Sequence, residues 1–162
     1  MTKIKHKKNN HFDEKGNVQM VDIGEKSITT RKAIATGIIN VSNDVIDSIE
    51  SNINKKGDVL SVASTAAVQA VKNTSTLIPL THNIQVTGVN VKFDIEKSKQ
   101  TISCTTEVKC DGKTGVEIEA LIGVQIGLLT IYDMCKYLDR SMVIGEIKLL
   151  FKEGGKSGKY KL

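Results

Sequence analysis

The sequence predicts an α+β domain. Segments rich in β-branched residues alternate with segments whose apolar residues recur at helical spacing, and one long apolar segment indicates a helix buried on most of its circumference. Their order is strand, helices, strand, strand, helix, strand, which is the split-βαβ, ferredoxin-like βαββαβ arrangement. We therefore expect an antiparallel four-stranded sheet with the helices packed on one face.

The first half of the chain provides one strand and two helices. Residues 33–41 are rich in β-branched residues and predict the first strand. Ser42 is placed to cap a short amphipathic helix, and Asp58 is placed to cap a second helix that runs to about Lys72. Pro79, the only proline of the chain, predicts a turn or an extended entry into the next strand.

The second half provides a hairpin, the long helix and a final strand. Alternating apolar residues predict a strand over 84–95, and its hairpin partner covers 101–110 after the polar turn 96–100. The long apolar helix is expected over 112–136, and the final strand over 142–152.

We expect a single domain over residues 13–152, flanked by two peripheral segments. Residues 1–12 form a flexible basic N-terminus, although the segment 11–22 contains a turn signal and can form an ordered arm on the body or on a neighbouring chain. The glycine- and lysine-rich segment 153–162 is expected to be mobile without a ligand and to contribute to the site.

The composition is that of a soluble globular domain. The 162 residues are 40% hydrophobic and 25% charged, which is enough to bury a core and argues against disorder throughout. An excess of 23 Lys and Arg over 18 Asp and Glu gives a net charge of +5. This moderate charge fits a phosphate-bearing partner, either nucleic acid or a nucleotide-like small molecule.

The cysteines and the hydropathy pattern predict a reduced, cytoplasmic protein. Cys104, Cys110 and Cys135 have no metal-type spacing, and the first two would lie roughly 20 Å apart on one strand, too far to pair. The basic start of the chain has no apolar region after it, and no run of about 18 or more apolar residues indicates a membrane span.

The long helix carries charged residues only near its two ends. Glu117 and Glu119 lie at the start, Asp133 and Lys136 at the end, and residues 120–131 are almost entirely apolar. Such charges are costly to desolvate unless paired, so they are functional candidates. Glu119 and Asp133 are separated by ~21 Å of helix axis and cannot both contact one small substrate. We therefore expect a site between subunits, where antiparallel helices bring Glu119 of one chain to Asp133 of another.

Several of these features also have simpler explanations. Asp133 and Lys136 are three residues apart, which fits a stabilising ion pair as well as a general acid/base pair. The segment 55–58 leads into a helix N-terminus that attracts anions, and the glycine-rich segment 154–158 is either a phosphate contact or a flexible tail. His82 can be a catalytic base, a metal ligand or a structural histidine.

Several motifs, taken together and in this order, resemble those of the cyclic pyranopterin monophosphate synthase family, the accessory protein C of molybdenum cofactor biosynthesis. They are MVDIGEKSITTR at 20–31, KGDVLSVA at 56–63, LIPLTH at 77–82, KTGVEIEAL at 113–121, TIYDMCK at 130–136 and GGKSG at 154–158. The resemblance covers nearly the whole chain from about residue 12 onward. TIYDMCK and the paired glutamates of GVEIEAL are its most specific motifs.

The resemblance implies a phosphorus-oxygen lyase with a ferredoxin-like fold. Family members convert (8S)-3',8-cyclo-7,8-dihydroguanosine 5'-triphosphate, which a radical partner enzyme makes from GTP, to cyclic pyranopterin monophosphate with release of diphosphate. They resemble one another in forming homo-hexamers, trimers of dimers, with sites at the dimer interface. The resemblance implies no cofactor required by the protein, no nucleic-acid partner and no membrane, while Mg²⁺ can enter through the substrate phosphates.

The resemblance also implies roles for individual residues. Asp133 aligns with the family's catalytic aspartate, and Lys136 with its catalytic partner. The substrate-contacting positions are Leu80, Thr81, His82, Ile118 and Glu119. Further polar residues that match the lining of the pocket are Glu117, Lys56 and Arg31, and the lysines that match phosphate contacts are Lys152 and Lys156. No protein metal ligand is implied.

The sequence departs from the family pattern at two motifs. The common LCHP is LTHN here, with Thr81 for cysteine and Asn83 for proline, so catalysis cannot depend on a thiol at this position. The common GVEMEAL has Ile118 for methionine, an apolar exchange of similar volume. Either change can alter substrate affinity.

A nucleic-acid-binding ferredoxin-like module is the alternative from another class, because it would use the basic termini and the open sheet face. Aromatic residues are only 4% of the chain and tryptophan is absent, which argues against bases stacking on the strands. A metal-dependent GTP cyclase is a third alternative, but His6 and His11 lie in the N-terminal segment and leave His82 alone as a ligand.

Overall fold

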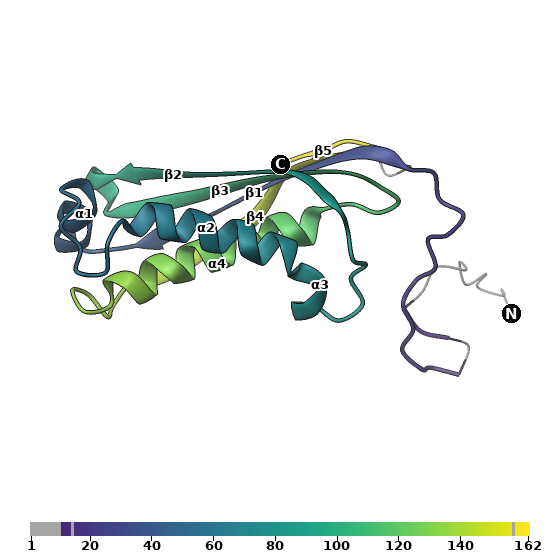
Figure 1. The fold of residues 1–162 in the computed structure, drawn as a ribbon, viewed down its shortest axis with the longest axis horizontal. Helices are drawn as coiled ribbons and strands as arrows, with labels where there is room; N and C mark the ends of the chain where they lie inside the picture. Colours follow the sequence, from purple (N-terminus) through teal and green to yellow (C-terminus); the bar gives the residue numbers. More distant parts are fainter. Residues whose placement is uncertain (1–10, 14, 157) are drawn as a thin grey trace, which may run out of the picture.

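Residues 11–13, 15–156 and 158–162 are described by the structure, a computed structural model. It is a two-layer α+β fold in which the helices pack against one face of an antiparallel sheet (Figure 1). The strands are β1 (Thr29–Asn40), β2 (Val86–Glu96), β3 (Thr101–Gly112), β4 (Val143–Glu153) and β5 (Tyr160–Lys161). The helices are α1 (Asn43–Glu50), α2 (Val59–Lys72), α3 (Thr74–Leu77), the 3-10 turn η1 (Lys97–Lys99) and α4 (Glu117–Cys135).

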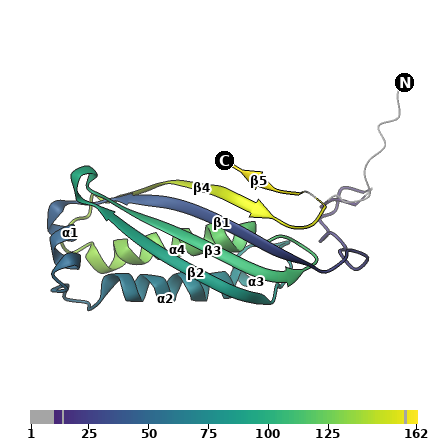
Figure 2. The same cartoon turned by 90° about the horizontal axis from the view of Figure 1, so that it is seen from above.

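The sheet has five strands rather than the four that the sequence predicts. Its order is β2-β3-β1-β4-β5, and every neighbouring pair is antiparallel. The additional strand β5 pairs with β4 at Phe151 and Lys152 and lies beside it at the edge of the sheet (Figure 2). A strand of two residues has no periodicity to detect, so the glycine- and lysine-rich sequence around it predicts a tail instead.

The starts of two elements differ from the sequence prediction, and one helix was not predicted. β1 begins at Thr29 rather than at residue 33, because it pairs with β3 along its whole length, from Thr29 opposite Gly112 to Asn40 opposite Thr101. The same pairing keeps Gly112 in β3, so α4 begins at Glu117 instead of at residue 112. The short helix α3 was not predicted.

The two predicted helix caps have different outcomes. Asp58 caps α2 as expected, since its Oδ1 accepts a hydrogen bond of 3.0 Å from the backbone N–H of Ser61. Ser42 occupies the N-cap position of α1, but its side chain makes no capping bond. Its backbone N–H instead donates to Oδ2 of Asp139 at 3.1 Å, which ties the start of α1 to the segment after α4.

The core lies between the sheet and the helices α2 and α4. Alternate residues of the two central strands point into it, and the fully buried ones include Ala33, Ala35, Ile39, Ile102 and Val108. α4 contributes Ala120, Val124, Leu128 and Ile131, which are also fully buried. Burial of one side of so apolar a helix fixes the direction of its axis against the sheet.

Two glycines let α4 approach its neighbours closely. A Cβ atom on Gly37 of β1 would lie 2.8 Å from a side-chain carbon of Ile147 and 2.9 Å from one of Val124. A Cβ atom on Gly123 would lie 2.8 Å from Thr106 and 2.9 Å from Val71. Both distances are shorter than packed carbon atoms allow, so α4 is held in one position along its middle. Its two ends are consequently fixed relative to the sheet.

α4 is long and apolar enough to cross a membrane by length and composition alone, which the sequence prediction did not anticipate. Half of this stretch is buried inside the fold, however, and the core helix of a soluble protein passes the same test. The three cysteines are buried free thiols, as predicted for Cys104 and Cys110 from their separation.

The N-terminal segment leaves the start of β1 and extends beyond the end of the sheet (Figure 2). The predicted flexible residues 1–10, with His6, lie outside the described part of the chain. In residues 11–28, which we call the arm, Phe12 forms an isolated bridge with Val18. Lys113 fastens the arm to the body, because its Nζ donates a 2.6 Å hydrogen bond to the carbonyl of Gly24.

Candidate functional site

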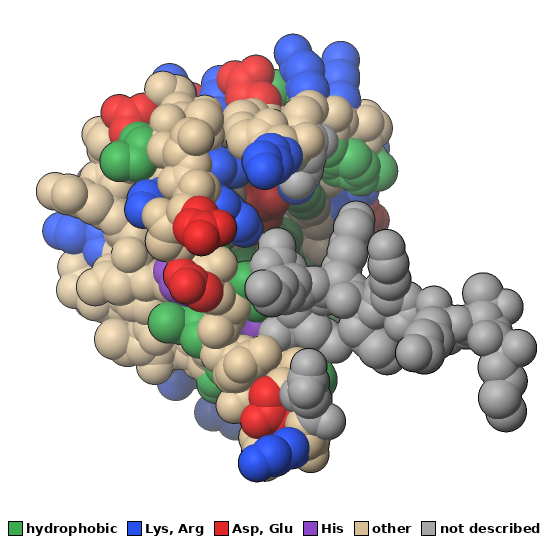
Figure 3. Space-filling model, turned by 90° about the vertical axis from the view of Figure 1, so that its right-hand side faces the viewer, with side chains coloured by type: hydrophobic (Ala, Val, Ile, Leu, Met, Phe, Trp, Pro, Cys, Tyr) green, Lys and Arg blue, Asp and Glu red, His purple; other side chains and the backbone are tan. Residues whose placement is uncertain are grey.

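A cleft opens at the N-terminal end of α4, where the arm, β1, β4 and the turn after α3 meet. It consists of two adjoining parts with volumes of about 750 and 460 Å³. Both parts are lined by Lys26 of the arm and by Thr114, Gly115 and Glu117. Figure 3 views this end of the molecule, where charged side chains and histidine surround a hollowed region.

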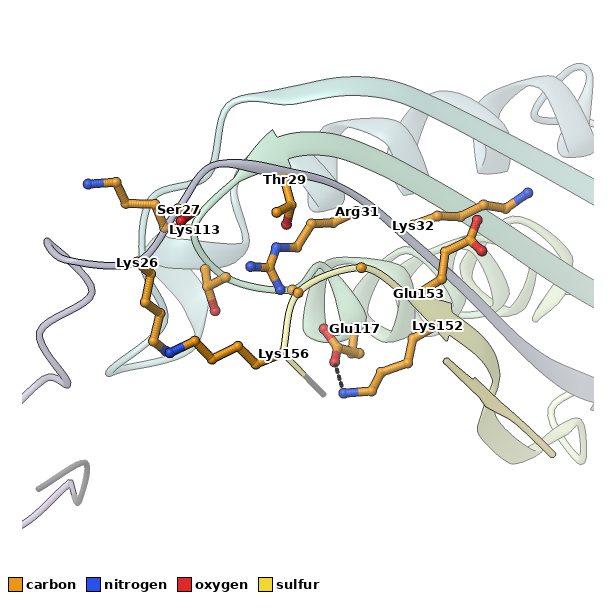
Figure 4. A pocket seen from close by; sticks show the side chains of 14 residues that line it. Lys26, Ser27, Thr29, Arg31, Lys32, Lys113, Glu117, Lys152, Glu153 and Lys156 are labelled. Atoms are coloured by element: carbon orange, nitrogen blue, oxygen red, sulfur yellow. Dashed lines mark hydrogen bonds and ion pairs between the residues drawn. The ribbon is translucent and has the colours of Figure 1, made fainter. Parts of the chain in front are cut away.

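The larger part of the cleft is strongly cationic. Its basic lining residues, contributed by the arm, β1, β4 and the segments after β3 and β4, are Lys26, Arg31, Lys32, Lys113, Lys152 and Lys156 (Figure 4). Among the described residues, the acidic ones that line this part are Glu117 and Glu153. Such an excess of cations from separate elements is suited to a ligand with several negative charges.

The side chains of two of these cations have neither an ion pair nor a hydrogen bond within the described residues. Nζ of Lys152 lies 2.8 Å from Oε1 of Glu117, and Arg31 donates through Nε to the carbonyl of Gly112 at 3.1 Å. Lys26 and Lys156, by contrast, have no ion pair within the described residues, and their side chains point toward one another in Figure 4. Like charges that converge in this way are stabilised when an anion lies between them.

Glycines bring Lys156 to the cleft. Gly154 has φ of +102°, and a Cβ atom there would collide with the backbone carbonyl oxygen of Thr30. Gly155 has φ of +71° and lies against the guanidinium of Arg31. Since other residues rarely adopt such angles, this pair of glycines allows the chain after β4 to turn across β1. The two glycines thus place the segment that carries Lys156 beside the cleft, and its predicted phosphate contact stays a prediction.

The smaller part of the cleft is more apolar. It is lined by Leu80, Thr81, His82, Ile118 and Glu119, which are all five of the substrate-contacting residues that the sequence predicts. Leu80 has φ of +64°, a left-handed conformation that costs a side-chain-bearing residue about 1–3 kcal/mol. Strain of this kind persists only where the surrounding structure imposes it, and it is frequent at ligand sites.

Glu119 is the most unusual acid of the cleft, because only 3% of its surface is exposed. Burial raises the pKa of its carboxyl, and the nearby charge of Glu117 raises it further. The carboxyl group faces a cavity and forms no hydrogen bond to another described residue. It can therefore exchange hydrogen bonds with a ligand, as an acceptor when ionised and as a donor when protonated.

A second charged cluster lies at the other end of α4. Oδ1 of Asp133 is 2.8 Å from Nζ of Lys136, and its Oδ2 is 3.1 Å from Nζ of Lys56. Lys56 also donates to the backbone carbonyl of Asp133 at 2.8 Å. Lys136 first and Lys56 second hold the pKa of Asp133 below its ordinary value, although 57% of its side chain is exposed. The carboxyl group is thus an ionised carboxylate held between two ammonium groups.

The structure therefore separates the predicted site residues into two groups. Nine of the twelve line the cleft, whereas Asp133, Lys136 and Lys56 do not line either part of it. The sequence places Lys56 with Glu117 and Arg31, but in the structure it contacts Asp133 instead. The fourteen residues from Glu119 to Asp133 correspond to ~21 Å of helix.

Sequence reasoning missed Lys26 and Lys113 as members of the cleft. Lys26 precedes β1 and Lys113 follows β3, so they are far apart in the chain. The pairing of Thr29 with Gly112 brings them to the same end of the sheet. A prediction of strand register, in addition to strand position, would have identified both lysines.

The described residues contain no group of three or more His, Cys, Asp or Glu side chains placed to hold a metal ion. The acids Glu117 and Glu119 line the smaller part together with His11 and His82. The cationic larger part can accept the phosphates of a ligand, with or without ions that those phosphates carry.

Comparison with known proteins gives consistent matches over most of the chain. Residues 20–155 match the MoaC family. The cyclic pyranopterin monophosphate synthase of Clostridium perfringens strain 13 is 52% identical over 150 residues, which cover 93% of this chain and 95% of the relative. Those of Thermoanaerobacter pseudethanolicus and Heliobacterium modesticaldum are 48% and 47% identical over 150 residues, or 93% of this chain and 95% and 94% of the relatives.

Proposed function

The chain belongs to the MoaC family, and we infer from this membership that it acts as a cyclic pyranopterin monophosphate synthase in molybdenum cofactor biosynthesis. It is a lyase whose substrate derives from GTP by cyclisation. In finer detail, we propose that it converts (8S)-3',8-cyclo-7,8-dihydroguanosine 5'-triphosphate to cyclic pyranopterin monophosphate and diphosphate.

One observation carries the choice of substrate. The cleft joins a part lined by six basic residues to a part that is apolar and contains a buried acid. A nucleotide-like molecule has the same two halves, a chain of phosphates and a flat heterocycle with hydrogen-bond donors. Because the two parts share Lys26, Thr114, Gly115 and Glu117, a single molecule can occupy both.

We propose a specific orientation for this substrate. The phosphates lie in the larger part, where Lys26, Lys152 and Lys156 supply charge-assisted hydrogen bonds. The ring system lies in the smaller part, against His82 and the carboxyl of Glu119. This orientation places the buried acid next to the ring nitrogens, where its raised pKa lets it keep its proton to a higher pH than an ordinary glutamate and donate it to the ring.

Asp133 and Lys136 are proposed as the acid/base pair. Rearrangement of the ring system requires proton transfers, and closure of the cyclic phosphate forms one P–O bond while the P–O bond to diphosphate breaks. The carboxylate of Asp133 is ionised and can accept a proton, and the ammonium of Lys136 at 2.8 Å can donate one. The cations of the larger part stabilise the charge of the departing diphosphate.

We propose that the two groups meet between subunits of a homo-hexamer, a trimer of dimers with its sites at the dimer interface. The separation of ~21 Å along α4 supports this arrangement, since one chain cannot place Glu119 and Asp133 on the same substrate. Leu129 and Ile118 on α4 are 51% and 40% exposed, which leaves apolar surface for a second copy. A ferredoxin-like class for the fold fits the order β2-β3-β1-β4.

The proposed enzyme requires no cofactor of its own, and Mg²⁺ enters only with the substrate phosphates. It is proposed to act in the cytoplasm, in keeping with its free cysteines, and without nucleic acid or membrane as partners.

The direct test is incubation of the purified chain with the cyclised guanosine triphosphate, with cyclic pyranopterin and diphosphate measured together. We expect both products in equal amounts, and turnover at least about 100-fold lower for the Asp133→Asn variant. Salt-dependent RNA binding without either product would overturn the proposal in favour of a nucleic-acid-binding module.

A further inference from the structure

We propose that Thr81 is a positioning residue, whose hydroxyl holds the turn of residues 78–81 in the strained form that shapes the smaller part of the cleft. The inference rests on the proposed function, because the substrate of that function is the ligand that binds against the turn. It concerns the residue at which this sequence departs from the common LCHP motif.

The backbone of the turn is unfavourable for its sequence. Pro79 occupies the second position and Leu80 the third, and the φ of +64° at Leu80 gives the type II geometry. Glycine or asparagine usually fills that third position, because a side chain is crowded there. The backbone bond that closes the turn, from the N–H of Thr81 to the carbonyl of Ile78, is long at 3.4 Å.

The hydroxyl of Thr81 supplies a second and shorter closure. Its Oγ1 donates to the same carbonyl of Ile78 at 2.8 Å, in a partly buried position. No other side-chain hydrogen bond within the described residues joins the two ends of this turn. A side chain that cannot donate here leaves only the long backbone bond to resist the strain at Leu80.

The beginning of the turn is anchored to the helical layer. The N–H of Ile78 donates to the carbonyl of Thr74 at 3.0 Å. Thr74 is 2% exposed, and its hydroxyl donates to the carbonyls of Ala70 and Val71 at the end of α2. Ile78 is thus tied to α2, and Thr81 ties the rest of the turn to Ile78. Loss of the hydroxyl bond of Thr81 would therefore free only the far side of the turn, which follows Ile78.

That far side is part of the cleft wall. Leu80, Thr81 and His82 line the smaller part together with Ile118 and Glu119. If Leu80 relaxes to a negative φ, the side chains of Leu80 and His82 change direction together. Thr81 thereby acts on the ligand through its neighbours, while Asp133 and Lys136 lie at the other end of α4 and keep their contacts.

The experiment compares Thr81→Val, Thr81→Ser and Thr81→Cys for KM, kcat and melting temperature with the cyclised guanosine triphosphate. Loss of the donor in Thr81→Val is expected to raise KM about 3- to 10-fold with kcat unchanged, as one net hydrogen bond predicts. Thr81→Ser, which keeps the donor, rescues KM. The weaker thiol donor of Thr81→Cys gives an intermediate KM.

Thr65→Val is the matched control, since it removes an equivalent hydroxyl-to-carbonyl bond of 2.9 Å within α2, outside the cleft. It is expected to leave KM unchanged. A wild-type KM for Thr81→Val overturns the inference, and so does a raised KM for Thr81→Ser, which would assign the effect to the methyl group. A lower melting temperature with unchanged KM would show a structural role alone. Absence of turnover by the wild-type chain would instead overturn the proposed function.

Discussion

The two ends of α4 carry carboxylates in opposite environments. At the N-terminal end Glu119 is buried against a cavity, has no partner among the described side chains and has a raised pKa. At the C-terminal end Asp133 is more than half exposed, lies between two lysines and has a lowered pKa. One end has a cavity lined by a buried acid, and the other has an ion pair that does not line that cavity.

This difference is the basis of our proposal that each end supplies half of a site. A buried acid that makes no hydrogen bond to another described residue is costly unless a ligand supplies one, whereas an exposed ion pair contributes little to stability and is free to act on a neighbour. The rigid middle of α4, held by Gly37 and Gly123, keeps the halves apart within one chain. The predictions below test whether the halves meet in an assembly.

Asp133→Asn is expected to have the largest effect. It removes the carboxylate that lies between Lys136 and Lys56, so turnover of the cyclised guanosine triphosphate should fall by at least about 100-fold. Size-exclusion chromatography should show the wild-type assembly. Asp47→Asn is the matched control, because Asp47 is also an exposed acid paired with a lysine, Lys97, but lies on α1. Wild-type turnover by Asp133→Asn would refute the role.

Mixing two variants, one altered at each end of α4, tests whether the two ends form one site from different chains. If Glu119→Gln and Asp133→Asn chains assemble together, a site that takes Glu119 from one chain and Asp133 from another is intact in roughly a quarter of the random combinations. Co-expression with different tags should therefore restore roughly a quarter of the wild-type turnover. Activity no higher than that of the separate variants would place both residues in the same chain's site.

Removal of lysines from the larger, cationic part of the cleft should mainly weaken the affinity for the substrate. Lys26→Ala and Lys156→Ala each remove a cation without an ion pair in the described structure, so each should raise KM by about tenfold while kcat changes little. Lys159→Ala is the control from the same glycine-rich segment, because Lys159 lies over the ring of Phe151 instead of in the cleft. An unchanged KM for both variants would show that the phosphates of the substrate do not bind in this part of the cleft.

The smallest expected effects concern the dependence of the folded state's stability on pH. Folding raises the pKa of Glu119 above its ordinary value of 4.5, so the wild type loses stability as pH rises through the raised pKa. Glu119→Gln should therefore melt a few degrees higher than the wild type at pH 7, and this advantage should disappear in acid. Melting curves from pH 4 to pH 8 measure it; an advantage that is independent of pH would contradict the assignment.

Asp133 should show the opposite sign. Its pKa is lowered from 3.8, so the ion pairs contribute stability at neutral pH that is lost as pH falls through the lowered pKa. Because the group is exposed, Asp133→Asn should lower the melting temperature only slightly.

The sequence predicts the parts of the fold that depend on periodicity. The long runs of β1, β2 and β3 and the cap of α2 by Asp58 follow from local patterns, and the structure confirms them. β5 was missed because pairing with β4 defines it, and α3 because four residues contain no period. Local patterns also placed the start of α4 too early, since Gly112 belongs to β3 through its pairing with β1.

For the candidate site, the sequence predicts distances along one helix but not contacts between elements. The separation of Glu119 from Asp133 needed only the rise of an α-helix. The contact of Lys56 with Asp133 depends on how the loop before α2 lies against the end of α4, which no local pattern specifies. The roles of the residues came from the family resemblance rather than from spacing.

The strand β5 has a consequence for the glycine-rich segment that carries Lys156. Lys152 pairs with Tyr160, and the N–H of Leu162 donates to the carbonyl of Leu150 at 3.0 Å, so the segment between β4 and β5 is attached to the sheet at both ends. It is a closed loop, and closure restricts the volume that Lys156 can explore. The attachment thereby raises the effective concentration of this ammonium group at the cleft, without any contact to the ligand from β5 itself.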